Sequence, residues 1–316
     1  MMFVKDLLKF LKPGTKQKIA EYYQRHNLAI RKAIRDELRL NLAARGMEGE
    51  ESESRVHVEV DKVGLPQMVA NIPIEDKDWL SAILTVYRPY LSMLAESTAQ
   101  VAELLFRPEL KELPEVMTLG RSVPEAHQLA QALLQRIKLL DLVERILAFN
   151  EDVLGAYQYD LNERAPSKIL LFWGVIGLVS QGQKLDLETL TALVLAHEMA
   201  HAYTHLGYDI DRKRWPSRAF AESDREVKEG LAQYYAARVM ERLKDRLPLG
   251  PDTFAQLLAK QSTPYHAHEP WMQEYTPEVV RAALISGRGK NPLFIDPFND
   301  ELADLAPRLK RRPKGK

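Results

Sequence analysis

The nine residues Leu193-Val194-Leu195-Ala196-His197-Glu198-Met199-Ala200-His201 hold two histidines four positions apart, with a glutamate directly after the first. The flanking residues are apolar and rich in alanine, a composition that favours a helix. Residues i and i+4 of a helix lie on the same face, one turn apart. The segment therefore predicts a helix that presents both imidazoles on one side.

The ends of this helix can also be predicted. Asp186 is a residue type that caps helix N-termini, and Glu188 places negative charge in the positive first turn. Gly207 suits the position after the last turn, where a left-handed conformation is common. We expect the helix to lie between Asp186 and Gly207.

Histidines with this spacing can bind one zinc ion through nitrogen atoms at about 2.0–2.1 Å. Glu198 lies roughly 100° around the helix from His197, where it can reach a metal-bound water without being a ligand. Two buried imidazoles and a carboxylate would be costly without a metal or other polar partners. The sequence therefore predicts a zinc (Zn2+) site with His197 and His201 as ligands. The competing interpretation is a surface helix whose histidines are incidental.

The His-Glu-x-x-His segment resembles the metal-binding motif of the zincin metallopeptidases. A catalytic zinc needs a third protein ligand. The metzincin pattern fails, because Thr204 and Gly207 stand where it has glycine and histidine. The segment Glu229-Gly230-Leu231-Ala232 resembles the Glu-Gly-(Leu/Phe)-Ala ligand segment of many gluzincins, which implies Glu229 as the third ligand. Gly230 would allow a close approach of backbones.

Other third ligands remain open. Glu222 has the spacing closest to that of thermolysin, and Glu226 lies on the same helical stripe, but both sit among charged residues that suit a solvated end. Asp209 or Asp211 would instead imply an aspzincin-like site. His205 continues the helical face but lies about 12 Å further along the axis, too far to join the same ion.

The resemblance also implies a mechanism, in which Glu198 acts as general base on a metal-activated water. In thermolysin-like enzymes a histidine or tyrosine downstream of the ligands stabilises the oxyanion. Gln233 stands where gluzincins often have an acidic residue, so the group that orients a ligand is not identified. The candidate oxyanion donors in this chain are His266, His268, Tyr265, Tyr234 and Tyr235.

These residues predict a zinc metallopeptidase that acts on a peptide or protein substrate. The Gly-x-Met-Glu-Asn motif of related aminopeptidases is absent from the sequence, which favours an endopeptidase. The alternative is a zinc-binding scaffold, or an inactive zincin-fold protein, that mediates protein interactions.

Composition narrows the classes of partner. Lys+Arg and Asp+Glu both number 44 in 316 residues, so the chain has no net positive charge that would favour binding to nucleic acid. Only the basic segment 308–316 has the charge that a nucleic-acid-binding segment would need. There is no cysteine, which excludes disulfides and thiolate ligands. The N-terminus lacks the apolar stretch of a signal peptide, and the longest apolar run, 169–179, is too short to span a bilayer. We expect a cytoplasmic protein without a membrane or nucleic-acid partner. Its oligomeric state is not indicated.

The expected fold is mainly α (α+β). Residues 1–120 are predicted as a largely helical N-terminal region with a short strand near 55–60. Residues 121–307 are predicted as a zincin-like domain with a small sheet beside the His-Glu-x-x-His helix, and 308–316 as a basic disordered tail. Pro108, Pro114 and Pro124 indicate a linker at the boundary.

Hydrophobic periodicity gives the remaining elements. The segment 169–179 is ambiguous between a strand entering a helix and one buried segment, and 46–54 is expected as an acidic loop. Strands are predicted at 55–60 and 155–160, and helices at 3–10, 16–42, 76–106 with a break at Pro89, 125–149, 253–260 and 277–286, with the second ligand helix ending near 243.

Overall fold

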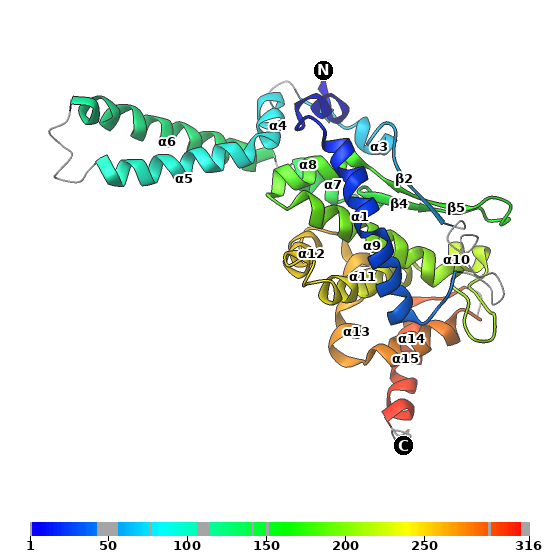
Figure 1. Ribbon diagram of the computed structural model, residues 1–316. Helices are drawn as coiled ribbons and strands as arrows, with labels where there is room; N and C mark the ends of the chain where they lie inside the picture. Colours follow the sequence, from blue (N-terminus) through cyan, green and yellow to red (C-terminus); the bar gives the residue numbers. More distant parts are fainter. Residues whose placement is uncertain are drawn as a thin grey trace.

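The computed structural model describes residues 2–42, 56–75, 78–105, 114–140, 142–149, 152–289 and 292–310. This part of the chain is mainly helical and carries small sheets (Figure 1), which confirms the predicted fold class. Among the described residues, no helix combines the length and hydropathy that crossing a bilayer requires.

The elements follow one another with helices predominating. In chain order they are β1 (Met2–Phe3), the 3-10 helix η1 (Val4–Phe10), α1 (Thr15–Leu38), β2 (Val56–Val60), α3 (Gln67–Ala70), β3 (Pro73–Ile74), α4 (Trp79–Val86), α5 (Arg88–Leu105), α6 (Pro114–Leu140), α7 (Leu142–Leu147), β4 (Gly155–Gln158), β5 (Ser167–Leu171), α8 (Trp173–Gln183), α9 (Leu187–Leu206), α10 (Ser217–Glu222), α11 (Arg225–Arg242), α12 (Gly250–Leu258), the 3-10 helix η3 (Thr263–His266), α13 (Glu269–Glu274), α14 (Pro277–Gly287) and α15 (Ile295–Lys310).

Helix α9 lies at the centre of the molecule and is buried on every side from Thr189 to Leu206. It packs against α1, α11, α12 and the β4–β5 ribbon. Asp186 caps it as predicted, because its carboxylate accepts a hydrogen bond from the Thr189 amide at 2.8 Å. The helix ends at Gly207, as expected, but the φ of Gly207 is −65°, so the predicted left-handed conformation is wrong. The chain leaves the helix in extended conformation and pairs Tyr208 with Asn41.

A three-stranded sheet lies beside α9, in the order β2-β5-β4. Strand β2 runs parallel to β5, with Val56 opposite Ser167, and β4 runs antiparallel to β5. Strand β4 is therefore an edge strand, and it contacts α9 directly. Because β2 precedes α5 and α6 in the sequence, this pairing joins the N-terminal region to the body that contains α9.

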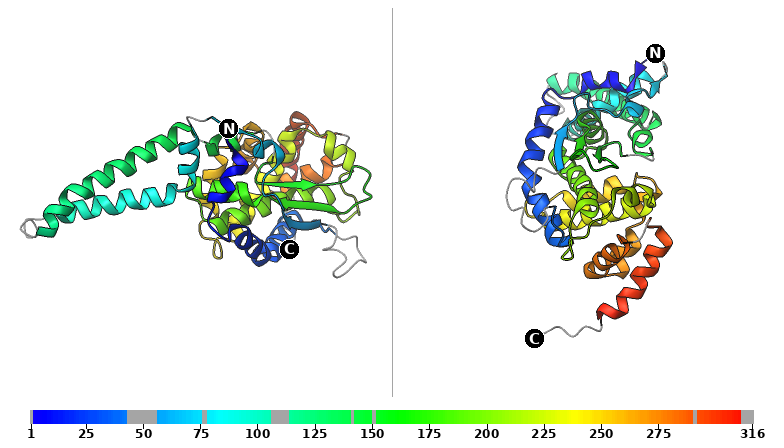
Figure 2. Two further views of the ribbon diagram at one scale, coloured as in Figure 1. Left: turned by 90° about the horizontal axis from the view of Figure 1, so that it is seen from above. Right: turned by 90° about the vertical axis from the view of Figure 1, so that its right-hand side faces the viewer.

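Helices α5 and α6 form a long hairpin that projects from this body (Figures 1 and 2). Of the three prolines predicted to mark a linker, Pro108 lies outside the described residues, and the other two lie in a helix. Pro114 begins α6, where its missing amide is not needed, and Pro124 lies inside the helix. Pro124 removes one backbone hydrogen bond without ending α6, since α6 packs along α5. The predicted boundary at residue 120 thus falls within a helix.

The other predicted elements agree with the structure in type more closely than in length. The ambiguous segment 169–179 is a strand entering a helix, β5 and then α8, and α1 ends at Leu38, before the predicted residue 42. The acidic loop 46–54 lies outside the described residues, as do residues 311–316 of the predicted tail. Residues 308–310 belong to α15, a helix that was not predicted.

Candidate metal centre

Helix α11 packs along α9 and brings Glu229 to the two histidines. Nε2 of His197 lies 3.1 Å from Nε2 of His201, and each lies 3.3 Å from Oε2 of Glu229. Four ligands placed tetrahedrally around an ion at zinc–nitrogen distances are separated by about 3.4 Å. The three atoms therefore form one face of a coordination tetrahedron.

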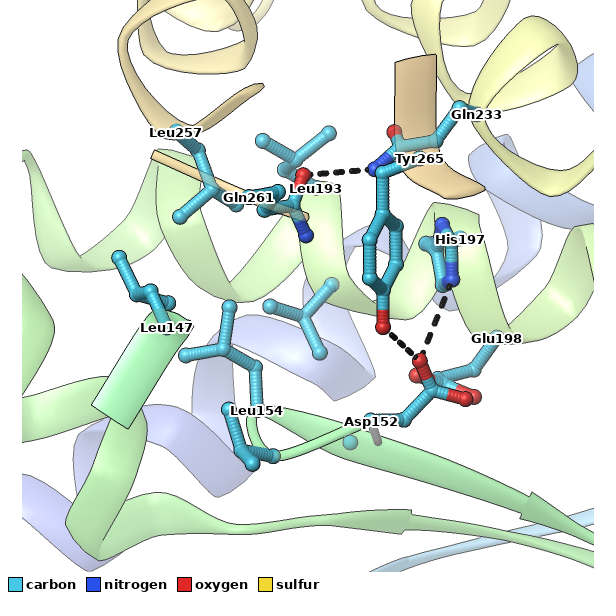
Figure 3. Close-up of a pocket in the computed structure, with 13 residues that line it drawn as sticks. Leu147, Asp152, Leu154, Leu193, His197, Glu198, Gln233, Leu257, Gln261 and Tyr265 are labelled. Atoms are coloured by element: carbon cyan, nitrogen blue, oxygen red, sulfur yellow. Dashed lines mark hydrogen bonds and ion pairs between the residues drawn. The ribbon is translucent and has the colours of Figure 1, made fainter. Parts of the chain in front are cut away.

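Asp152 offers a fourth candidate ligand atom, from the segment between α7 and β4. Its Oδ1 lies 3.9 Å from Nε2 of His197, and the four ligand atoms lie within 4.8 Å of one another. The hydroxyl of Tyr265 donates a hydrogen bond to the same Oδ1 (Figure 3). Asp152 thus stands near the fourth corner of the tetrahedron, with a longer separation than the other three atoms show.

The donor set fits a divalent metal ion. Oε2 of Glu229 is buried and has no hydrogen-bond partner among the described residues, whereas Oε1 lies 3.6 Å from Nε of Arg225. One carboxylate oxygen thus faces the histidines and the other faces a cation. Burial raises the pKa of Glu229, but His201 and His197 outweigh it, and the net pKa is lowered. Two imidazoles with carboxylates suit zinc and several other transition metals.

Glu198 lies next to this group without belonging to it. Its side chain is buried, accepts a hydrogen bond from the Tyr157 backbone, and leaves Oε2 without a partner among the described residues. Burial raises the pKa of Glu198 well above its usual range, and the charges of Asp152 and Glu229 raise it further. A buried carboxyl with one unpaired oxygen is suited to exchanging protons.

Gly155 explains how the edge strand approaches α9. A Cβ atom at Gly155 would lie 2.8 Å from both Cγ and Oε1 of Glu198, too close for any other residue without movement. Gly230 has a similar role next to Glu229, since a Cβ atom there would lie 2.7 Å from the ring of Trp271. Both glycines let a neighbouring element come close to a residue of the site.

A pocket opens beside the candidate ligands (Figure 3). His197, Glu198, Asp152 and Tyr265 line one side of it. The remaining walls are mainly aliphatic, and they are formed by Leu147, Val153, Leu154, Leu193, Val194 and Leu257. An apolar pocket with a few converging polar groups is the usual form of a small binding site.

Gln233 and Gln261 also line the pocket, and the Gln233 amide donates to Oε1 of Gln261 at 2.8 Å. Gln233 occupies the position where gluzincins often have an acidic residue. In this chain the residue at that position forms a hydrogen bond with Gln261, another side chain of the pocket wall. Its hydrogen bond therefore stabilises the wall of the pocket.

His205 is fully buried one turn beyond His201 and lies outside the metal group, as predicted. Its Nδ1 lies 2.9 Å from the Tyr157 hydroxyl and its Nε2 lies 3.0 Å from the Ser217 hydroxyl. Burial, with a smaller contribution from His201, lowers the pKa of His205 to about 3. His205 is a neutral packing residue that connects α9 to β4 and α10.

Of the five predicted oxyanion donors, Tyr265 lines the pocket, whereas His266, His268, Tyr234 and Tyr235 do not. Nδ1 of His266 lies 3.0 Å from Glu269, and Nδ1 of His268 lies 2.9 Å from the Tyr265 carbonyl oxygen, within the turn that holds Tyr265. Tyr234 is buried on α11 among the charges of Arg238, Glu37 and Glu278. The 3-10 geometry of η3 instead directs Tyr265 into the pocket.

The other candidate third ligands lie elsewhere as well. Glu222 is exposed at the end of α10, and Glu226 is half-buried in the first turn of α11. Asp209 lies 3.1 Å from Arg288, and Asp211 is exposed. In the described part of the chain, the metal group consists of Asp152, His197, His201 and Glu229.

Asp152 was missed by the sequence analysis. It lies 45 positions before His197 in an acidic segment that carries no motif, and only the pairing of β4 with β5 brings it to the site. A carboxylate three residues before the predicted strand 155–160 was the available signal.

Comparisons with protein-family models, with curated proteins and with solved structures found no match to this chain. Its function is therefore inferred from the geometry of the site.

Proposed function

We propose that this chain is a zinc-dependent metallopeptidase, similar to the gluzincins, that hydrolyses peptide bonds in an extended substrate. One observation carries the proposal. Glu198 presents an unpaired, buried carboxylate oxygen in the same pocket as His197, beside the face formed by the ligand atoms of His197, His201 and Glu229. A general base next to three protein ligands is the arrangement that metal-assisted hydrolysis requires.

The roles of the residues follow from their positions. His197, His201 and Glu229 would hold zinc, which when bound acts as a Lewis acid and lowers the pKa of its water toward roughly 7. The charge of a bound zinc ion would lower the pKa of Glu198 and favour its ionised form. Oε2 of Glu198 would then accept a proton from the attacking water and transfer it to the leaving amine. The Tyr157 amide and Gly155 hold the Glu198 carboxylate in place for both transfers.

Tyr265 is the best placed donor for the oxyanion. Its hydroxyl faces the pocket, and Nη2 of Arg225 donates to it at 3.2 Å. Burial, reinforced by the charges of Asp152 and Glu229, raises the pKa of Tyr265 well above its usual range. The hydroxyl therefore stays protonated at neutral pH and can donate a hydrogen bond. Of the five donors that the sequence offered, we assign this role to Tyr265 rather than to His266, His268, Tyr234 or Tyr235.

Substrate binding would use the edge strand and the apolar pocket. Strand β4 pairs with β5 on one side only, so an extended peptide could add to its free edge beside Glu198. The aliphatic walls around Leu154 and Leu193 would accept an apolar side chain next to the scissile bond. Because strand addition recognises the backbone of an extended peptide, we propose an endopeptidase that cleaves unfolded segments after or before an apolar residue.

The test combines metal analysis with hydrolysis. The purified protein should bind one zinc ion per chain and cleave an unstructured protein such as casein. Glu198→Gln keeps the shape of the side chain and removes the proton acceptor, so hydrolysis should fall by about 10²–10⁴-fold while zinc stays bound. Glu226→Gln, which changes a carboxylate outside the metal group, is the matched control and should behave as wild type.

Loss of zinc from Glu198→Gln would make Glu198 a ligand and contradict its proposed role. Wild-type protein that binds zinc without any hydrolysis would support the second candidate, a zinc-binding scaffold. The position of Asp152 favours that candidate, because four protein ligands are typical of structural zinc sites.

A further inference from the structure

Asp152 occupies the position that a substrate would need. A reactive site requires a free fourth position beside three protein ligands. Oδ1 of Asp152 stands near that position, 3.9 Å from Nε2 of His197, and also accepts the hydrogen bond of the Tyr265 hydroxyl. A carbonyl oxygen of a bound peptide would require the same two interactions. Oδ1 of Asp152 therefore occupies both the fourth position of the metal group and the hydrogen-bonding position at the Tyr265 hydroxyl, where a substrate carbonyl oxygen would bind.

Asp152 also differs from the other three candidate ligands in its exposure to solvent and in the element that carries it. The side chains of His197, His201 and Glu229 are 5–9% exposed and lie on the packed helices α9 and α11, whereas the side chain of Asp152 is 24% exposed. Asp152 lies outside any helix or strand, between α7 and β4. A ligand on such a segment can leave the group without disturbing the helices.

We propose that Asp152 is a displaceable fourth ligand that closes the metal site until a substrate takes its place. The proposal rests on the proposed function, because it presumes that the group binds zinc. Turning Asp152 outward leaves the fourth position and the Tyr265 hydroxyl available together. The closed form blocks the fourth position in the absence of substrate, and the open form leaves room for the attacking water and the peptide carbonyl oxygen.

The test measures ligand binding as well as hydrolysis. In Asp152→Ala and Asp152→Asn, zinc affinity, measured by competition with a chelator, should fall by about tenfold or more, as expected for a lost ligand or supporting group. Acetohydroxamate, a small chelating ligand, should bind the zinc-loaded variants about tenfold more tightly than wild type, because no carboxylate competes for the free position. Asp211→Asn, an exposed carboxylate outside the group, is the control and should change neither value.

The two measurements separate the outcomes. Unchanged zinc and hydroxamate affinities in the Asp152 variants would show that Asp152 is not a ligand, and weaker zinc binding with unchanged hydroxamate affinity would show that it is not displaced. Either result overturns the inference. If wild type and variants all fail to hydrolyse peptides, the proposed function fails, but the zinc and hydroxamate affinities still decide whether Asp152 is displaceable.

Discussion

Helix α9 and the α5–α6 hairpin are both long helical regions, but they differ in what surrounds them. From Thr189 to Leu206 every residue of α9 is buried, polar residues included. The hairpin projects from the body, and Met93, Leu94 and Leu129 on its surface are exposed. A polar group in α9 must find a partner inside the protein, whereas a residue of the hairpin can be solvated. Substitutions of side chains in and around α9 should therefore change stability or zinc affinity strongly, and substitutions on the surface of the hairpin should change them little.

The largest expected effect is at Glu229. Glu229→Gln removes the charge that faces the two histidines, and zinc affinity should fall by more than about 100-fold, beyond the loss typical of an outer-shell change. Glu222→Gln is the matched control, because Glu222 is exposed and lies outside the group, and it should leave zinc affinity unchanged. The measurement is a zinc titration against a chromophoric chelator. The reverse result would transfer the third ligand to Glu222.

The second prediction concerns how His205 makes the free energy of unfolding depend on pH. Its pKa is about 6.5 in the unfolded chain and about 3 when folded, so below pH 6.5 the unfolded state binds the extra proton and the stability of the fold decreases as pH falls. The free energy of unfolding should decrease by about 1.4 kcal/mol per pH unit between these values, or about 2–3 kcal/mol from pH 6.5 to 4.5.

His205→Gln can keep hydrogen bonds to Tyr157 and Ser217 without gaining a proton. Urea unfolding of zinc-free protein at pH 7.5 and pH 4.5 should therefore show a smaller acid loss for the variant, by about 2–3 kcal/mol. The other titrating groups are common to both proteins, so the difference isolates His205. Equal acid losses would mean that His205 is protonated in the folded state.

An intermediate effect is expected where the edge strand meets α9. Gly155→Ala would place a methyl group 2.8 Å from Glu198, forcing a shift that should destabilise the protein by about 1–3 kcal/mol. Hydrolysis should decrease, because the Glu198 carboxylate moves. Zinc affinity should fall by no more than Asp152→Ala lowers it, because among the described residues Asp152 is the one candidate ligand on the same segment as Gly155. Gly120→Ala, where a Cβ atom meets no neighbour within 4 Å, is the control. A larger loss of zinc affinity than that of Asp152→Ala would contradict the assignment of Glu198 as a non-ligand.

The smallest effect is expected on the hairpin. Leu129 is 63% exposed on α6, so Leu129→Lys should change the free energy of unfolding by no more than about 0.5 kcal/mol. Thermal unfolding and the zinc titration should both match wild type. A large destabilisation would show that the surface of the hairpin is covered in solution, and the contrast with α9 would then fail.

Parts of the site could be predicted from local sequence. The spacing of His197 and His201 places both on one helical face, and Asp186 marks the start of that helix, because helix periodicity and capping depend on neighbouring residues alone. The segment around Glu229 indicated a second buried helix. The alternating valines of β2 predicted a strand for the same reason.

Tertiary structure decided the remainder. Asp152 and Tyr265 reach His197 from segments 45 positions before it and 68 positions after it, through the pairing of β4 with β5 and the turn of η3. The parallel pairing of β2 with β5 joined regions that the prolines had appeared to separate. Contacts between distant segments depend on how whole elements pack, so no local pattern encodes the contacts that bring Asp152 and Tyr265 to His197.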